Sequence, residues 1–319
     1  MKLQTRVPLT KTASPVTYNS KVLLLGSCFV TNMGARLRYF KFKTLENPFG
    51  ILYHPNAILN VISRAVKSEY FNPAGLFEHN EGWHSFEVHS EMSKPSAEAL
   101  ENALNEALRG TRTTLMECSH LLITLGTAWG YRLKESGALV ANCHKVPQSA
   151  FNKELQTMAS IKSCLKAIIR EIRTLNEKTQ IIFTISPVRH LKDGFVGNQK
   201  SKAHLISALH EVLEESEDKA LAYFPAYEIQ MDELRDYRFY DSDLLHPNEL
   251  AADYIWDIFK ECWIADAAYP VMDTVMEIQK GLQHRPFNPD SRAHQQFRQA
   301  LVARMDALRN KFPGITFES

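Results

Sequence analysis

The stretch that most constrains the fold is residues 21–29, Lys-Val-Leu-Leu-Leu-Gly-Ser-Cys-Phe. Its four consecutive apolar residues, 22–25, are too few for a helix but suit a strand buried on both faces of a sheet. After Gly26 the apolar residues return at helical spacing, so the pattern predicts a strand, a tight turn and a helix. We therefore expect Ser27 at the carboxyl edge of a parallel sheet, where open α/β sheets bind ligands.

A second polar group of residues lies far downstream. Asp243 precedes His246 by three residues, and Pro247 follows where a helix is expected to begin. A histidine paired with a carboxylate is the general base that activates a serine. The sequence therefore predicts a triad in which Ser27 attacks an acyl carbon, His246 transfers the proton and Asp243 orients the imidazole.

These residues give the chain a resemblance to a known family. Residues 26–30 are similar to the signature of the GSCFA family, with Val30 in place of its alanine, and Asp243-x-x-His246 resembles the C-terminal block of SGNH/GDSL hydrolases. Segments 47–50, 142–145 and 186–189 are also similar to GSCFA segments, so the resemblance extends over almost the whole chain. It implies a three-layer, flavodoxin-like fold and the hydrolysis of esters whose identity the family does not define.

Acyl transfer also needs hydrogen-bond donors for the oxyanion of the tetrahedral intermediate. We expect two of them to be the backbone N–H groups of Ser27 and Gly50, in turns that follow neighbouring strands. SGNH hydrolases usually add an asparagine after the third strand, where this chain has Thr127. Thr127 and Asn142 are the alternatives for the third donor, and Asn142 is favoured because its amide is a true donor.

Other side chains compete for the site or complete it. Cys28 adjoins Ser27, but neighbouring side chains diverge in a tight turn, so we interpret Cys28 as a small buried residue. Cys143 beside His144 is a second possible nucleophile, although adjacent strand residues face opposite ways. Trp129 is expected in the core. The substrate-binding candidates are Asn47, His144, Arg189 and His190.

Composition narrows the class of protein. The net charge is +1 with both signs spread along the 319 residues, so neither nucleic acid nor a membrane is an expected partner. No signal peptide or apolar span is visible, which predicts a cytoplasmic protein. The five scattered cysteines and the histidines lack metal-ligand spacing, so no metal and no cofactor are expected. The expected partner is a small-molecule or carbohydrate ester, and nothing indicates the oligomeric state.

Strand-like and helix-like segments alternate along the chain. This order predicts a mostly parallel five-stranded sheet between helices, with strands at 22–25, 41–45, 120–125, 180–185 and 221–229. Helices are expected at 57–66, 96–115, 155–175, 201–213 and 248–263, with an inserted strand or hairpin at 77–88 and a hairpin at 131–141. We predict a catalytic domain at 1–263 and a helical extension at 264–319, which buries an apolar face or shapes the pocket.

Three functions fit these observations. The first is a serine esterase or deacylase acting on a small acyl group, such as an O-acetyl group on a sugar or a metabolite. The second is an acyltransferase of the same fold, in which another alcohol replaces water. The third is a non-catalytic module that binds a carbohydrate or a protein, and the intact serine, aspartate and histidine argue against it.

Overall fold

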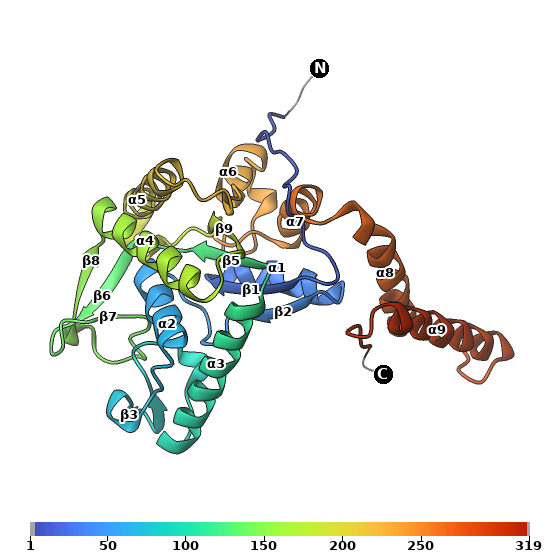
Figure 1. Ribbon diagram of the computed structural model, residues 1–319, viewed down its shortest axis with the longest axis horizontal. Coiled ribbons are helices and arrows are strands. Elements are labelled where there is room, and N and C mark those ends of the chain that lie inside the picture. The colour runs from blue at the N-terminus through green and yellow to red at the C-terminus, as the bar shows by residue number, and fades with distance from the viewer. Residues whose placement is uncertain (1–3, 318–319) are drawn as a thin grey trace.

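A five-stranded sheet forms the centre of the computed structural model, which describes residues 4–317 (Figure 1). Every strand pairing in it is parallel, in the order β10 (Leu221–Tyr223), β9 (Gln180–Ile185), β5 (His120–Leu125), β1 (Lys21–Gly26) and β2 (Lys43–Glu46). Numbered along the chain, these strands lie in the order 2-1-3-4-5, which is the flavodoxin-like arrangement. The predicted α/β fold class is confirmed.

Helices cover both faces of this sheet. One layer holds α2 (Pro55–Lys67), α3 (Ala97–Glu117), α4 (Met158–Leu175) and α5 (Gly194–Glu214), and the other holds α1 (Cys28–Tyr39) and α7 (Glu249–Trp263). The apolar run of β1 serves both layers, because Leu23 and Leu25 pack into the first core and Val22 and Leu24 into the second. This explains why the strand reads as continuously apolar and not as alternating.

Two small antiparallel sheets are inserted between the main elements. β3 (Phe77–His79) pairs with β4 (Gly82–His84), and β6 (Trp129–Leu133) lies between β7 (Leu139–Val140) and β8 (Phe151–Leu155). The insertion expected at 77–88 is a hairpin, and the hairpin predicted at 131–141 is present. β8 was not predicted, because residues 151–154 were assigned to no element and residue 155 was expected to begin a helix. That helix, α4, starts at Met158, where Thr157 caps it.

Two other predicted boundaries were wrong. The fifth strand, expected to reach residue 229, ends at Tyr223, and Pro225 precedes a short helix, α6 (Ala226–Glu228). Proline has no N–H to donate to a strand ladder, which accounts for the early end. α5 begins at Gly194, seven residues before its predicted start, because its first turns expose Phe195 and Val196 and lack an apolar stripe.

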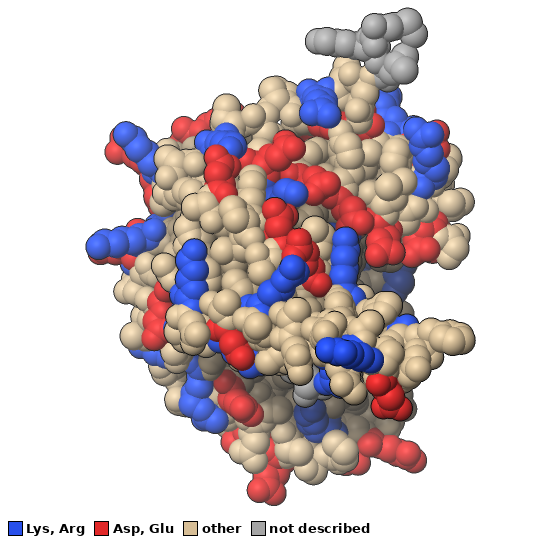
Figure 2. All heavy atoms as spheres, turned by 90° about the vertical axis from the view of Figure 1, so that its right-hand side faces the viewer, with Lys and Arg blue, Asp and Glu red and all other residues tan. Residues whose placement is uncertain are grey.

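The C-terminal segment forms α8 (Tyr269–Gln283) and α9 (Arg292–Lys311), which lie on the β2 side of the sheet (Figure 1). Val275, Ile278 and Leu308 join the core formed by α1 and α7, so the extension buries an apolar face. Figure 2 views this side of the molecule, where acidic and basic side chains are interspersed. The boundary at residue 264 stays a prediction. Within residues 4–317, no helix has the length and apolarity to cross a membrane.

Candidate active site

A cavity of about 480 Å³ lies at the carboxyl edge of the sheet. Its walls come from the segments that follow three of the parallel strands, at Cys28 after β1, Thr127 after β5 and Val188 after β9. The β6–β7 hairpin and the loop that carries His246 complete it. The carboxyl edge is where the sequence predicted a ligand site, and the side chains that line it are the basis for assigning its chemistry.

His246 and Asp243 form the pair that their spacing predicted. The His246 Nδ1 atom lies 2.6 Å from Asp243 Oδ2, while Asp243 Oδ1 accepts the backbone N–H groups of Leu245 at 2.8 Å and His246 at 3.0 Å. These hydrogen bonds lower the pKa of Asp243 to about 2, so the carboxylate is charged at neutral pH. A charged carboxylate at this distance places the imidazole proton on Nδ1 and leaves Nε2 to accept another.

In the turn between β1 and α1, two neighbouring side chains differ in their exposure and in their access to the cavity. Ser27 is fully buried, its Oγ atom has no hydrogen-bond partner among residues 4–317, and it does not line the cavity. It occupies the N-cap position of α1 without making a side-chain cap. Cys28 is partly exposed and lines the cavity together with His246. The predicted triad requires contact between the Ser27 hydroxyl and His246. The structure shows no hydrogen bond between them.

The two backbone donors expected for an oxyanion are already in use. The Ser27 N–H donates to the Thr124 carbonyl at 3.1 Å, and the Gly50 N–H donates to the Asn47 carbonyl at 2.8 Å. The Ser27 bond extends the β1–β5 pairing and the Gly50 bond closes a turn, so local backbone geometry fixes both. Both N–H groups would have to give up these acceptors to bind an oxyanion.

The two alternatives for a third donor both line the cavity. Asn142 accepts the His144 N–H through Oδ1 at 2.8 Å, which leaves its Nδ2 group to donate. The Thr127 hydroxyl contacts Ser201 Oγ at 3.0 Å and accepts the Trp129 N–H at 3.1 Å. Asn142 is thus the freer donor of the two.

The four substrate-binding candidates divide into two pairs. Arg189 and His190 line the cavity, whereas Asn47 and His144 do not. Asn47 Oδ1 accepts the Gly26 N–H at 2.9 Å, and this bond fixes the end of β1. His144 is buried and bonds the Ser85 carbonyl at 2.8 Å through Nε2, so both residues make contacts that hold the fold and neither lies at the cavity wall.

Arg189 and His190 differ in their environment. The Arg189 guanidinium donates to the Leu244 carbonyl at 2.5 Å and lies 4.5 Å from the centre of the Tyr240 ring, so it supports the loop that holds His246. Burial, together with the charges of Lys202 and His246, lowers the pKa of His190 to about 3. A neutral His190, whose buried Nε2 has no partner within the described chain, is suited to hydrogen-bonding a ligand.

Aromatic side chains form a wall of the cavity that the sequence reading did not identify. Tyr53, Trp129 and Tyr131 line it, and the Lys153 ammonium lies 5.3 Å and 5.5 Å from the ring centres of the last two. The prediction that Trp129 belongs to the core was wrong. The signal was available, because residues 129 and 131 share one face of a short strand.

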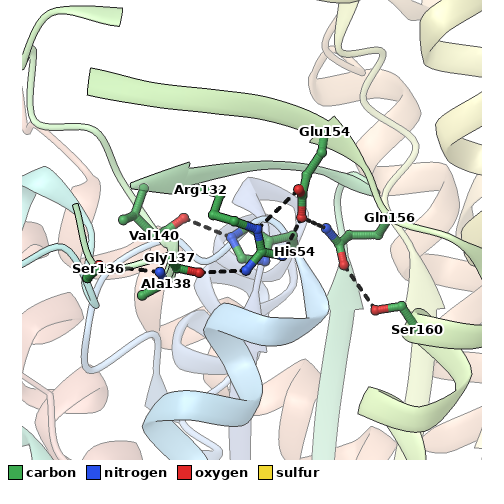
Figure 3. Close-up of polar contacts among 9 residues, drawn as sticks. All are labelled: His54, Arg132, Ser136, Gly137, Ala138, Val140, Glu154, Gln156 and Ser160. Atoms are coloured by element: carbon green, nitrogen blue, oxygen red, sulfur yellow. Dashed lines mark hydrogen bonds and ion pairs between the residues drawn. The ribbon is translucent and has the colours of Figure 1, made fainter. Parts of the chain in front are cut away.

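Polar contacts on the β6–β8 sheet hold this wall in place (Figure 3). Arg132 makes two hydrogen bonds to Glu154, at 3.1 Å and 2.5 Å, and Glu154 accepts one from Gln156 at 2.7 Å. His54 at the start of α2 bonds the Val140 carbonyl of β7 at 2.9 Å. A bidentate pair of this kind fixes orientation as well as distance, so the aromatic residues stand on a rigid support.

A buried lysine underlies the carboxyl edge of the sheet. Lys202 is 1% exposed, and its ammonium donates to the carbonyls of Gly126 at 2.8 Å and Ser186 at 2.7 Å. It therefore joins the ends of β5 and β9. Burial lowers its pKa to about 7. Nothing in the helical pattern of residues 194–214 distinguishes this lysine from its solvent-facing neighbours.

Comparison with known proteins gives the following likenesses. The chain is similar in structure to a carbohydrate esterase family 3 protein from Talaromyces cellulolyticus, at 7% identity and a TM-score of 0.37 over 81% of this chain and 99% of that one. It is similar to the acetyl xylan esterase Est2A from the rumen bacterium Butyrivibrio proteoclasticus, at 11% identity and a TM-score of 0.39 over 77% and 64%. TM-scores this low mark distant likenesses. No curated protein matches the chain.

Family profiles match by sequence. The profile of the GSCFA family matches residues 21–259, and the profile described as the C-terminal domain of GSCFA domain proteins matches residues 275–319. The first match covers the parallel sheet, the β1–α1 turn and the His246–Asp243 pair. The chain belongs to the GSCFA family.

Proposed function

We propose that this protein is a hydrolase that cleaves a small acyl group from an ester. The acyl group is transferred to a nucleophile on the β1–α1 turn, and His246 acts as the general base and then as the general acid. Asp243 holds the imidazole in the required tautomer. The sequence assigns the nucleophile to Ser27, and the adjacent Cys28 is the other candidate.

The observation that carries this proposal is the 2.6 Å contact between His246 and Asp243 beside a cavity that reaches the turn. A histidine oriented in this way is of use where a proton must be taken from a weak nucleophile. Asn142 supports the same chemistry, because its free amide can donate to an oxyanion in the cavity.

The cavity wall indicates the class of substrate. Tyr53, Trp129 and Tyr131 offer aromatic faces, and neutral His190 offers a hydrogen bond. Apolar faces combined with a few polar groups suit a sugar ring, which has apolar C–H faces and polar edges. We therefore propose an acylated carbohydrate, with an O-acetyl group as the leading candidate.

Ester turnover by matched histidine variants tests the proposal. His246→Gln is expected to reduce the hydrolysis of p-nitrophenyl acetate by about 10³-fold or more, by analogy with triad deletions. His210→Gln is the control, because His210 is half-buried against Tyr223 and does not line the cavity. The absence of turnover by the wild type on acetyl, butyryl and longer esters would refute hydrolysis and favour a binding module. Turnover that requires an added alcohol would instead identify an acyltransferase.

A further inference from the structure

We infer that the nucleophile is the Sγ atom of Cys28 and not the Oγ atom of Ser27, so that Cys28, His246 and Asp243 form a thiol-dependent triad. This inference rests on the proposed function, because it names the atom that receives the acyl group. The two residues are adjacent, and the direction of each side chain decides between them.

The environment of Ser27 does not suit a nucleophile. Its side chain is completely inaccessible, and its hydroxyl bonds neither to the helix that it precedes nor to any histidine in the described part of the chain. Gly126 closes over it, since a Cβ atom at that position would come within 3.2 Å of the Ser27 Cβ. A substrate cannot approach this hydroxyl without displacement of the β1 and β5 strand ends.

Cys28 lies where an attacking group is needed. It is the first residue of α1, it is partly exposed, and it lines the same cavity as His246. The charges of Lys202 and Asp243 are both near enough to change the pKa of its thiol. The thiol thus feels the charge of the buried lysine and that of the Asp243 carboxylate, and it shares its cavity with His246. No hydrogen bond joins it to His246 in the described chain, and such contacts commonly tighten only when substrate binds.

The oxyanion donors also favour Cys28. The Ser27 N–H is committed to Thr124, whereas the N–H groups of Cys28 and Phe29 belong to the first turn of α1, where a helix supplies no acceptor. Hydrogen bonding from these two N–H groups to the Cys28 sulfur lowers the pKa of the thiol and so favours the thiolate. An oxyanion formed on an acyl group at Cys28 would lie at this helix N-terminus, where N–H groups and the helix dipole stabilise negative charge.

The state of the thiol explains why the His246–Asp243 pair is needed. Burial raises the pKa of Cys28, although the charge of Lys202 opposes this effect, so the group is a thiol at neutral pH. His246 Nε2 takes the thiol proton as Sγ bonds to the acyl carbon. The ester C–O bond then breaks, and the leaving alcohol receives that proton. Water, deprotonated by His246, attacks the thioester, which releases the carboxylic acid and restores the thiol.

Matched variants and trapping of the acyl-enzyme test the inference. With p-nitrophenyl acetate, Cys28→Ala is expected to lose at least about 10³-fold in kcat/KM, whereas Ser27→Ala keeps its turnover within about tenfold. Cys143→Ala is the control, since Cys143 is partly exposed but does not line the cavity. Acid quenching and peptide mass spectrometry should locate the acetyl group on Cys28, and neutral hydroxylamine should remove it as it removes a thioester.

The possible outcomes separate this inference from the proposed function. An acetyl group found on Ser27, stable to neutral hydroxylamine, would overturn the inference and leave ester hydrolysis intact. An active Cys28→Ala variant would do the same.

The rate at which iodoacetamide alkylates Cys28 tests the inference without any substrate. Cys28 is expected to react at least about tenfold more slowly in His246→Gln than in the wild type at pH 7, while the rate at Cys143 stays constant. Equal rates at Cys28 in both proteins would overturn the inference even where no ester is turned over.

Discussion

Lys202 is expected to impose a pH dependence on stability that its replacement by methionine removes. Burial lowers its pKa from the usual 10.5 to about 7. A lowered lysine pKa means that the unfolded chain binds more protons at this site than the folded chain between these two values. The free energy of unfolding therefore rises with pH in this window, and the cost of burying the ammonium is fully present below pH 7.

The size of the effect follows from this difference in protonation. Each pH unit at one full proton difference is worth about 1.4 kcal/mol, and Lys202 is half-titrated at pH 7, so the gain between pH 7 and pH 9 is about 2 kcal/mol. Lys202→Met should lack this gain. The variant also leaves the carbonyls of Gly126 and Ser186 without their donor, at about 1–3 kcal/mol each, so stability at a single pH is not diagnostic.

Urea unfolding at several pH values, followed by circular dichroism, measures the effect. The difference in unfolding free energy between the wild type and Lys202→Met should change by about 2 kcal/mol from pH 7 to pH 9. Lys200→Met is the control, because Lys200 is exposed on the same helix and its curve should run parallel to the wild type. A Lys202→Met curve parallel to the wild type would refute the assignment of a lowered pKa to this lysine.

Three further predictions concern the site and its support. Asp243→Asn should reduce kcat by about 10⁴-fold, because the asparagine stabilises the wrong tautomer of His246. The far-ultraviolet circular dichroism spectrum should stay unchanged, and retention of kcat would exclude a catalytic role for the His246–Asp243 pair. Gly50→Ala should lower Tm and kcat/KM together. The φ angle of Gly50 is 74°, which strains an alanine, and an added Cβ would lie 2.5 Å from the Cβ of His89, which lines the cavity. An unchanged Tm would contradict this predicted strain. Ile278→Ala should cost about 2–5 kcal/mol in urea unfolding while kcat stays constant, and a selective loss of kcat would show that α8 acts on the site.

Local sequence was sufficient to predict the parallel sheet and the histidine–aspartate pair. The apolar run of β1 ends at Gly26, whose φ of 133° suits the turn there, and the same pattern recurs at the end of β5. Asp243 and His246 are three residues apart on one turn, with Leu244 at a φ of 59°, so a single loop brings them together. The histidine–aspartate contact is local, so chain geometry limits its arrangement. The paired strands lie far apart in the chain, but each carries its own apolar run, which marks it as a buried strand.

The other parts of the site depend on contacts between distant segments. The β8 strand is short and half polar, and it exists because β6 offers an edge for it. His144 was expected in the pocket, yet its ring turns to the Ser85 carbonyl, a partner that lies 59 residues away. Such pairings leave no periodic signal in the sequence.

The sequence by itself therefore determined the fold class, the edge of the sheet that carries the cavity and the His246–Asp243 pair that we propose as the general base. Only the tertiary structure decided which neighbour in the β1–α1 turn reaches the cavity. Residues 27 and 28 differ by one step along the chain, and the packing of β1 against β5 directs Ser27 inward beneath Gly126. The start of α1 leaves Cys28 on the cavity side. Side-chain direction at such a turn is fixed by the elements packed against it, because a side chain directed toward the paired strand ends is covered by them, whereas its neighbour is directed elsewhere.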